Sequence, residues 1–411
     1  MGQACAGIPC SLISLKCRNW FGKKPINCCL IAAKSLKIAN IRSRCDAIRR
    51  DLAYDTIPIL DIYSQVGAIP MEQMRVPTDQ VRFSWRRLDR FQKWAMITTI
   101  ATYFLIFVGG IVRASGAGLG CPDWPKCFGY WIPPASADMI AQHGFDASQF
   151  NPTLMWIEYI NRLIGMLIGF FLLITTYLML RHYRKSKRVF WSVLGALALT
   201  LFQGWLGGKV VHLELEGWIV TLHMILALVI VGLLLYATVC AFFPNGRPIA
   251  NVPAERRTVA RWGQALVGFG LVQLTLGALV RGHIDDVSSK MNIPRSDWVS
   301  QVGITDPLHR TGALIFTISI LAATYAIVHN RSLHPWIHRT AWIASGLVLT
   351  QVAAGIGLAY GALPPPLQAI HLIVGSLLIG CLMTLVLLAY RLPVSPSTSK
   401  EAFKQVAEAS H

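Results

Sequence analysis

Eight apolar segments divide the chain after residue 93 into pieces of membrane length. They cover residues 94–112, 159–180, 190–209, 219–242, 262–281, 309–329, 340–360 and 368–390. About 20 apolar residues are enough for a helix to cross a hydrocarbon layer about 30 Å thick. The pattern therefore predicts an all-α polytopic membrane protein with eight transmembrane helices. It argues against a soluble helical protein, in which repeated apolar runs of this length are rare.

Polar residues recur at fixed spacing within these apolar segments. In the first half of the chain, His223 follows Asn161 by 62 residues (223 − 161). In the second half, His371 follows His309 by the same number (371 − 309). One unit is thus written twice, with asparagine in the first copy where the second has histidine. The repeat predicts two pseudo-symmetric four-helix bundles in parallel orientation, because four spans return the chain to its starting side.

The repeat predicts four parts along the chain. Residues 1–93 are a basic extension, 94–242 the first half, 262–390 the second half and 391–411 a tail. The first 50 residues hold ten Lys or Arg and one acid, a composition typical of an organelle transit segment. The alternative is a gene start placed too early, with Met71 or Met74 as the true initiator.

Charge along the chain indicates topology. The net charge of +18 would suggest nucleic acid in a soluble protein, but here the basic residues lie between apolar segments. Lys and Arg are concentrated in the connections after the second, fourth and sixth spans and in the amino-terminal segment. By the positive-inside rule both termini are expected on the cytoplasmic side of a bacterial membrane, or alternatively on the matrix side of the mitochondrial inner membrane.

Three histidines are candidate ligands of haem iron. His223, His309 and His371 lie in or at the ends of spans four, six and eight, near the outer face. Facing imidazoles are the usual means of holding haem in a helical bundle. A lone histidine is more often a packed, hydrogen-bonded bundle residue, but the duplicated spacing favours ligation by His309 and His371. Copper or zinc is disfavoured because no further thiol or carboxylate accompanies the pair.

Four arginines are candidate partners for haem propionates. They are Arg113, Arg162, Arg281 and Arg310, all at the outer ends of their spans. Arginine binds carboxylates in a bidentate manner. The alternative is that these side chains reach the lipid headgroups.

A carboxylate lies one turn from the asparagine of the first half. Glu158 precedes Asn161 by three residues, so both lie on one face of a helix. A carboxylate at the mouth of an apolar bundle could move protons. The alternative is a simple ion pair between Glu158 and Arg162.

Two cysteines are separated by five residues in the first outer loop. A disulfide between Cys121 and Cys127 is plausible because the outer side is oxidising. Both a structural role for this bond and a redox role remain open. The spacing is not usual for zinc.

Several motifs together resemble the haem A synthase family over about residues 90–390. They are Glu158-Tyr-Ile-Asn-Arg162, Val112-Arg-Ala-Ser-Gly-Ala-Gly118, Gln203-Gly-Trp-Leu-Gly207, His309-Arg310 and the segment from Gln351 to His371. The resemblance implies an oxidoreductase that acts on a CH3 group, converting the C8 methyl of haem O to the formyl group of haem A. It also implies eight spans and an outer-loop cysteine pair.

The resemblance assigns roles to individual residues. It implies that His309 and His371 hold a haem b in the second half, which passes electrons. It also implies that His223 faces the substrate haem O, with Glu158 as the catalytic carboxylate. The sequence departs from the family at Asn161, where histidine is usual. The substrate haem would then have one protein ligand and an open position near Glu158.

The expected partners are haem O and haem A, the lipid bilayer and, by the resemblance, haem O synthase and the assembling terminal oxidase. A homo-oligomer is possible, and no nucleic acid is expected. The alternative function is a b-type cytochrome that only transfers electrons or holds haem, its first site disabled at Asn161. A solute transporter is disfavoured because broken helices and midplane charges are missing from the pattern.

Overall fold

The computed structural model describes residues 4–5, 8–9, 88–243 and 252–392. The chain divides into two compact units, residues 1–83 and 84–411. The described part of the first unit is a pair of antiparallel strands, β1 (Ala4–Cys5) and β2 (Ile8–Pro9). The transit-like extension predicted for residues 1–93 and the tail predicted for 391–411 fall almost entirely outside the described residues.

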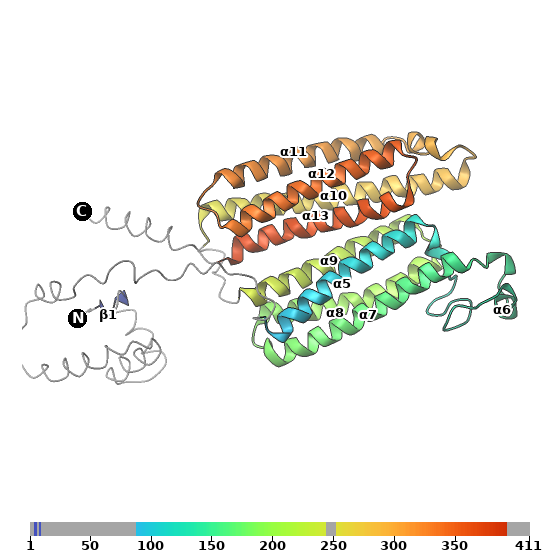
Figure 1. The fold of residues 1–411 in the computed structure, drawn as a ribbon, viewed down its shortest axis with the longest axis horizontal. Helices are drawn as coiled ribbons and strands as arrows, with labels where there is room; N and C mark the ends of the chain where they lie inside the picture. Colours follow the sequence, from blue (N-terminus) through green and yellow to red (C-terminus); the bar gives the residue numbers. More distant parts are fainter. Residues whose placement is uncertain (1–3, 6–7, 10–87, 244–251, 393–411) are drawn as a thin grey trace, which may run out of the picture. The chain divides into compact units, whose positions relative to one another are not determined.

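Eight long helices build the described part of the second unit (Figure 1). They are α5 (Arg90–Ala114), α7 (Pro152–His182), α8 (Lys187–His212), α9 (Gly217–Phe242), α10 (Ala254–Lys290), α11 (Thr305–His329), α12 (Pro335–Tyr360) and α13 (Pro365–Arg391). Each is long and apolar enough to cross a membrane. The prediction of an all-α, multi-pass membrane protein with eight spans is confirmed.

Several helices extend beyond the predicted apolar spans. Helix α10 runs to Lys290, so Asp285 and Asp286, which the sequence placed in a loop, are helical. Helix α7 begins at Pro152, where the side chain of Asn151 accepts a hydrogen bond from the Leu154 N–H. Hydropathy locates only the apolar part of a helix, whereas caps such as Asn151 determine where the backbone turns.

The helices contact one another in two rings of four. Helices α5, α7, α8 and α9 form one ring in that order, and α10, α11, α12 and α13 form the other. In each ring the second and fourth helices are therefore diagonally opposite. The two rings meet where α13 contacts α5 and α9, and where α9 contacts α10. Helices α9 and α13 consequently have the highest buried share of their apolar windows, 50% each.

In each ring, a side chain of the first helix donates hydrogen bonds to carbonyls at the end of the fourth helix. The Gln92 side chain of α5 donates to the Ala241 carbonyl of α9 at 3.0 Å. The Arg256 side chain of α10 donates to the carbonyls of Leu388, Ala389 and Leu392 at 2.7–3.1 Å. These groups supply partners for carbonyls that the end of a helix leaves unpaired.

The connection between the third and fourth helices has the same backbone conformation in both rings, between α8 and α9 and between α12 and α13. Glu214 and Leu215 have φ values of 48° and 65°, and Ala362 and Leu363 have 54° and 55°. Side chains with a Cβ seldom adopt this left-handed region. The two pairs are 148 residues apart (362 − 214), the spacing that separates Asn161 from His309 (309 − 161). The sequence repeat thus extends to an unusual backbone conformation.

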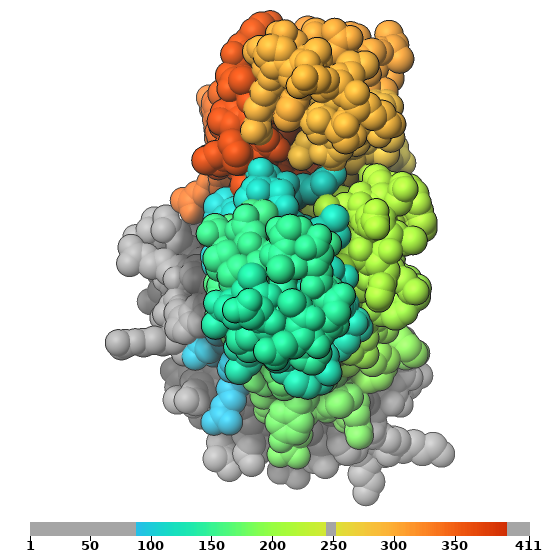
Figure 2. All heavy atoms as spheres, turned by 90° about the vertical axis from the view of Figure 1, so that its right-hand side faces the viewer, coloured from blue at the N-terminus to red at the C-terminus, as the bar shows by residue number. Residues whose placement is uncertain are grey.

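Long connections occupy one end of the two rings, which we call the loop end. The segment between α5 and α7 contains η2 (Ala117–Leu119), α6 (Ala137–Gln142) and η3 (Ala147–Gln149). The segment between α10 and α11 contains η5 (Arg295–Asp297) and η6 (Val299–Gln301). Figure 2 looks at this end, with the first segment in teal over the first ring and the second in orange over the other ring.

Replacing Arg256 with alanine is expected to destabilise the protein. Three carbonyls would lose a charged donor in a buried place, at a cost of about 2 kcal/mol or more in the free energy of unfolding. Gln92→Ala is the matched change in the first ring. It removes the bond to the Ala241 carbonyl, at about 1 kcal/mol, and the exposed bond that the Gln92 Oε1 accepts from the Asp89 N–H, whose loss is smaller because water replaces it. Denaturation midpoints in detergent would rank the two variants, and equal midpoints would contradict the comparison.

Candidate functional site

Four polar residues lie within the first ten residues of their helices, toward the loop end of the two rings. Asn161 is near the start of α7 and His223 near the start of α9, while His309 and His371 are near the starts of α11 and α13. Each pair therefore comes from diagonally opposite helices of one ring. A diagonal pair faces across the bundle, which is the arrangement that a planar ligand between two side chains requires.

Each of these four residues packs against a glycine of a neighbouring helix. A Cβ on Gly277 of α10 would lie 3.2 Å from the His309 Cε1, and one on Gly355 of α12 would lie 3.3 Å from the His371 Cε1. In the first ring the partners are Gly207, 3.5 Å from the His223 Cε1, and Gly109, 4.0 Å from the Asn161 Oδ1. The glycines let the polar side chains lie against the helix backbone.

The buried Nδ1 atoms of His223, His309 and His371 complete no hydrogen bond within the described residues. The main chain of Gln273 interacts with the His309 ring, and that of Gln351 with the His371 ring, but neither contact meets hydrogen-bond geometry. Imidazoles buried without full partners are costly. Their chemistry and their glycine cradles fit haem ligation. Groups of three or more His, Cys, Asp or Glu side chains that could hold a metal ion are absent from the described residues.

Three glutamines accompany the histidines. Gln203 donates to the carbonyl of His223 at 2.7 Å, and its own Oε1 is buried without a partner among the described residues. The Oε1 atoms of Gln273 and Gln351 are also buried without a hydrogen-bond partner among the described residues. Buried polar groups of this kind collect where a polar ligand or water completes them. Gln203 and Gln351 are 148 residues apart (351 − 203), which is the spacing of the repeat, whereas Gln273 has no glutamine at the matching place in the first ring.

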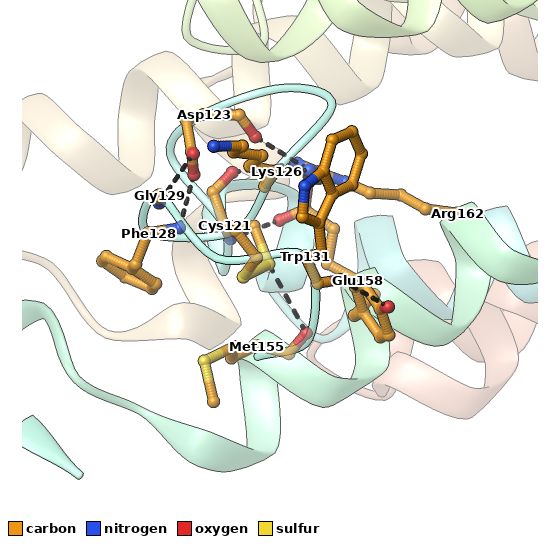
Figure 3. The surroundings of a disulfide bond; sticks show 11 residues. Cys121, Asp123, Lys126, Phe128, Gly129, Trp131, Met155, Glu158 and Arg162 are labelled. Atoms are coloured by element: carbon orange, nitrogen blue, oxygen red, sulfur yellow. Dashed lines mark hydrogen bonds and ion pairs between the residues drawn. A yellow bond between two sulfur atoms is a disulfide. The ribbon is translucent and has the colours of Figure 1, made fainter. Parts of the chain in front are cut away.

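Glu158 and Arg162 form a buried ion pair that holds the loop between α5 and α7 (Figure 3). The Arg162 Nη2 lies 2.5 Å from the Glu158 Oε1, and the Cys121 N–H donates to the Glu158 Oε2 at 2.7 Å. Arg162 also donates to the carbonyls of Cys121, Asp123 and Lys126 at 2.7–3.0 Å. The ion pair that the sequence offered as the alternative for Glu158 is therefore present, and the carboxylate faces the loop.

The held loop is closed by a disulfide between Cys121 and Cys127, whose Cα atoms are 4.7 Å apart. Both cysteines are fully buried against Met155, Ile140 and Phe128. The Asp123 carboxylate accepts hydrogen bonds from the N–H groups of Phe128 and Gly129, which fixes the turn after Cys127. The environment is that of a structural bond within a small core.

The loop reaches from α7 across to the other side of the first ring. Trp124 packs on Gly208 of α8, where a Cβ would lie 2.9 Å from the indole. Gly118 packs on Leu215, in the connection between α8 and α9. The segment that contains the disulfide thus covers the end of the ring that holds Asn161 and His223.

Later in the same segment, the Ser148 N–H donates a hydrogen bond to the Asp146 carboxylate, which lowers the pKa of Asp146.

Each of the four predicted propionate arginines pairs with a carboxylate of the protein. Arg113 of the first ring and Arg281 of the second both pair with Asp285, and the Arg281 Nη1 lies 2.7 Å from it. Arg310 pairs with Asp306 at 2.9 Å, and Arg162 with Glu158. Asp285 therefore links the two rings at the loop end. The predicted fifth span ended at residue 281, so Asp285 was expected in a connection and this role was not predicted. Its i,i+4 spacing to Arg281 was the available signal.

Comparisons with known proteins agree with the geometry. The haem A synthase of Shewanella oneidensis is 27% identical over 74% of this chain and 97% of its own length. That of Rhizobium etli (strain CFN 42) is 28% identical over 64% of this chain and 80% of its own. That of Alkalihalophilus pseudofirmus is 24% identical over 72% and 97%, respectively.

A family model described as "Cytochrome oxidase assembly protein" matches residues 92–383, which contain all eight long helices except for a few terminal residues. The match includes both rings, the disulfide loop and the four diagonal positions. The chain therefore belongs to the COX15-CtaA family of cytochrome oxidase assembly proteins.

Proposed function

We propose that this protein is a haem A synthase, which oxidises the C8 methyl of haem O to the formyl group of haem A. The observation that carries the proposal is the pair of diagonal sites, each with histidine against a glycine-exposed backbone, in a chain of this family. Relatives named heme A synthase match nearly their whole length. The enzyme class is an oxidoreductase that acts on a CH3 group.

The two rings have different roles in the proposal. His309 and His371 would hold a haem b in the second ring, and His223 would face the substrate haem O in the first. The haem groups, when bound, supply the one-electron and oxidative chemistry that amino-acid side chains lack. His309 and His371 come from diagonally opposite helices of the second ring, which supports a shared ligand.

Glu158 is the proposed catalytic carboxylate. It lies one turn before Asn161 on α7 and is 4% exposed. Methyl oxidation to a formyl group releases protons, and a carboxylate at the mouth of the ring could accept them. Because Arg162 and the Cys121 N–H bind both carboxylate oxygens, Glu158 also positions the disulfide loop over the site. The loop would exclude water and keep the reacting porphyrin oriented.

The arginines remain the proposed partners of the haem propionates. Arg113 and Arg281 are the best placed, because they share the single carboxylate of Asp285 and the Arg281 Nε is buried without a partner among the described residues. A propionate could complete this network, since guanidinium binds carboxylate in a bidentate manner. Arg162 and Arg310 already pair with Glu158 and Asp306, so each would bind a propionate as a second carboxylate.

We further propose that the two rings arose by duplication and correspond to residues 94–242 and 262–390. The constant spacing of the histidine sites and of the left-handed pairs in the third connections supports this origin. The basic connections favour cytoplasmic termini in a bacterial cytoplasmic membrane, with the mitochondrial inner membrane as the alternative. Proposed partners are haem O synthase, the assembling terminal oxidase and a second copy of the chain.

A second candidate function is a b-type cytochrome that holds haem or transfers electrons without oxidising a methyl group. Asn161 in place of a ligand is the observation that favours it. The buried Glu158–Arg162 pair and the disulfide loop favour the enzyme instead, because electron transfer alone does not require a covered site with a carboxylate.

Replacing either His309 or His371 with alanine is expected to abolish the low-spin signal of the second-ring haem. The reason is that low-spin iron here needs both imidazoles. Electron paramagnetic resonance of the purified ferric protein measures this. Each variant should retain any haem of the first ring. A double variant that still shows a low-spin haem would contradict the assignment.

Replacing Glu158 with glutamine is expected to preserve haem binding but abolish the formyl product. The amide keeps the size of the side chain, whereas it cannot accept protons at the site. The ratio of haem O to haem A extracted from cells measures the effect. Asp306→Asn, which changes the carboxylate beside Arg310 in the second ring, is the matched control. Unchanged haem A in Glu158→Gln would remove Glu158 from the mechanism.

Cys121 and Cys127 are expected to be linked in protein purified without reductant. Mass spectrometry of alkylated peptides should recover them as one cross-linked peptide. The buried Cys240 is the internal control for a free thiol. Two alkylated cysteines in the loop would contradict the bond.

A further inference from the structure

The first ring departs from the repeat at one side chain. Asn161 stands where the second ring has His309, and its Oδ1 is buried without a hydrogen-bond partner among the described residues. At the diagonally opposite position both rings have histidine, His223 in the first and His371 in the second. A buried amide oxygen without a partner is costly, and native structures pair most such groups.

Asn161 contacts its glycine less closely than His309 does. A Cβ on Gly109 would be 4.0 Å from the Asn161 Oδ1, whereas one on Gly277 would be 3.2 Å from the His309 Cε1. Asparagine is also shorter than histidine. The glycine that accommodates an imidazole is thus retained in the first ring, although the imidazole itself is not.

The charged neighbours of Asn161 are engaged elsewhere. Glu158 is bound by Arg162 and by the Cys121 N–H. Arg162 is bound by Glu158 and three loop carbonyls. Gln203 donates to the His223 carbonyl. None of these side chains takes the place that His309 has in the second ring.

We propose that the first-ring site holds its haem through His223 alone and binds a small exogenous ligand, such as an oxygen species of one or two heavy atoms, on the side of Asn161. The Asn161 amide hydrogen-bonds to that ligand. This inference rests on the proposed haem function. Carboxamide is a poor iron ligand, whereas its NH2 group and oxygen can each stabilise a polar ligand bound to iron.

The experiment uses full-length protein purified in detergent with its haem, and carbon monoxide as the probe. Carbon monoxide binds ferrous haem only where an axial position is free or is held by a readily displaced ligand. We expect the haem of the first ring to bind it and that of the second ring to remain unchanged. The ferric protein should correspondingly show one high-spin and one low-spin haem by electron paramagnetic resonance.

Two reciprocal variants provide matched controls. Asn161→His should abolish carbon monoxide binding and convert the high-spin signal to low spin, because it recreates the second-ring pair. His309→Asn should create a second carbon monoxide site, because it recreates the first-ring arrangement. Both readouts are spectroscopic and do not depend on turnover.

A third variant tests the hydrogen bond itself. Asn161→Ala should retain carbon monoxide binding but shift the C–O stretching frequency: upward if the NH2 group of Asn161 faces the bound oxygen, downward if its Oδ1 lone pair does. An unchanged frequency would show that the amide does not contact the ligand and would overturn that part of the proposal.

The outcomes separate this inference from the proposed function. Wild-type protein in which both haems are low spin and refuse carbon monoxide would overturn the inference, while formation of haem A in the same cells would preserve the function. Protein with the expected spectra that produces no haem A would overturn the function and favour the b-type cytochrome. Carbon monoxide bound in Asn161→His as in the wild type would also overturn the inference.

Discussion

A polar side chain inside a helical bundle in lipid needs a partner, and this constraint organises both rings. Within the apolar helices the protein places imidazoles and amides near the loop end, each against a glycine of the neighbouring helix. Several of their atoms remain unpaired within the described residues. Such groups are costly in the hydrocarbon layer unless a ligand or an ordered water completes them. Under the proposed function, haem binding would therefore also stabilise the rings.

The same constraint explains why the loop end is covered. Glu158 and Arg162 would be costly near the mouth of an apolar ring if they stood alone. Together they satisfy each other and the backbone of the loop that contains the disulfide. The loop in turn places Trp124 against Gly208 on the far side of the ring. One ion pair thus connects the catalytic candidate, the disulfide and the cover of the site.

Much of this fold could be predicted from the sequence, because apolar length and the repeat at 148 residues are strong signals in lipid. The eight spans and the matched spacing of the histidines follow from them, whereas the diagonal placement of α11 and α13 is evident only from the helix packing. The ends of α7 and α10 could not be predicted, since helix caps and charged terminal turns lie outside any apolar window. The role of Asp285 as a link between Arg113 and Arg281 was missed for the same reason. The orientation of Glu158 toward Cys121 depends on contacts far apart in sequence, which spacing does not reveal.

The two rings keep the same frame but differ in what closes them. In the second ring, His309 fills its glycine cradle, and Arg295 of the connecting segment binds the Leu363 carbonyl at 2.7 Å. In the first ring, Asn161 contacts Gly109 less closely, and the loop over the ring is held by a disulfide and an ion pair. A ring that only transfers electrons benefits from two strong axial ligands and needs no space for a reacting molecule. A ring that oxidises its own haem needs room beside the iron and protection from water. Under the proposed function, asparagine at position 161 and the held loop would both serve the oxidising ring, and both occur in the first ring.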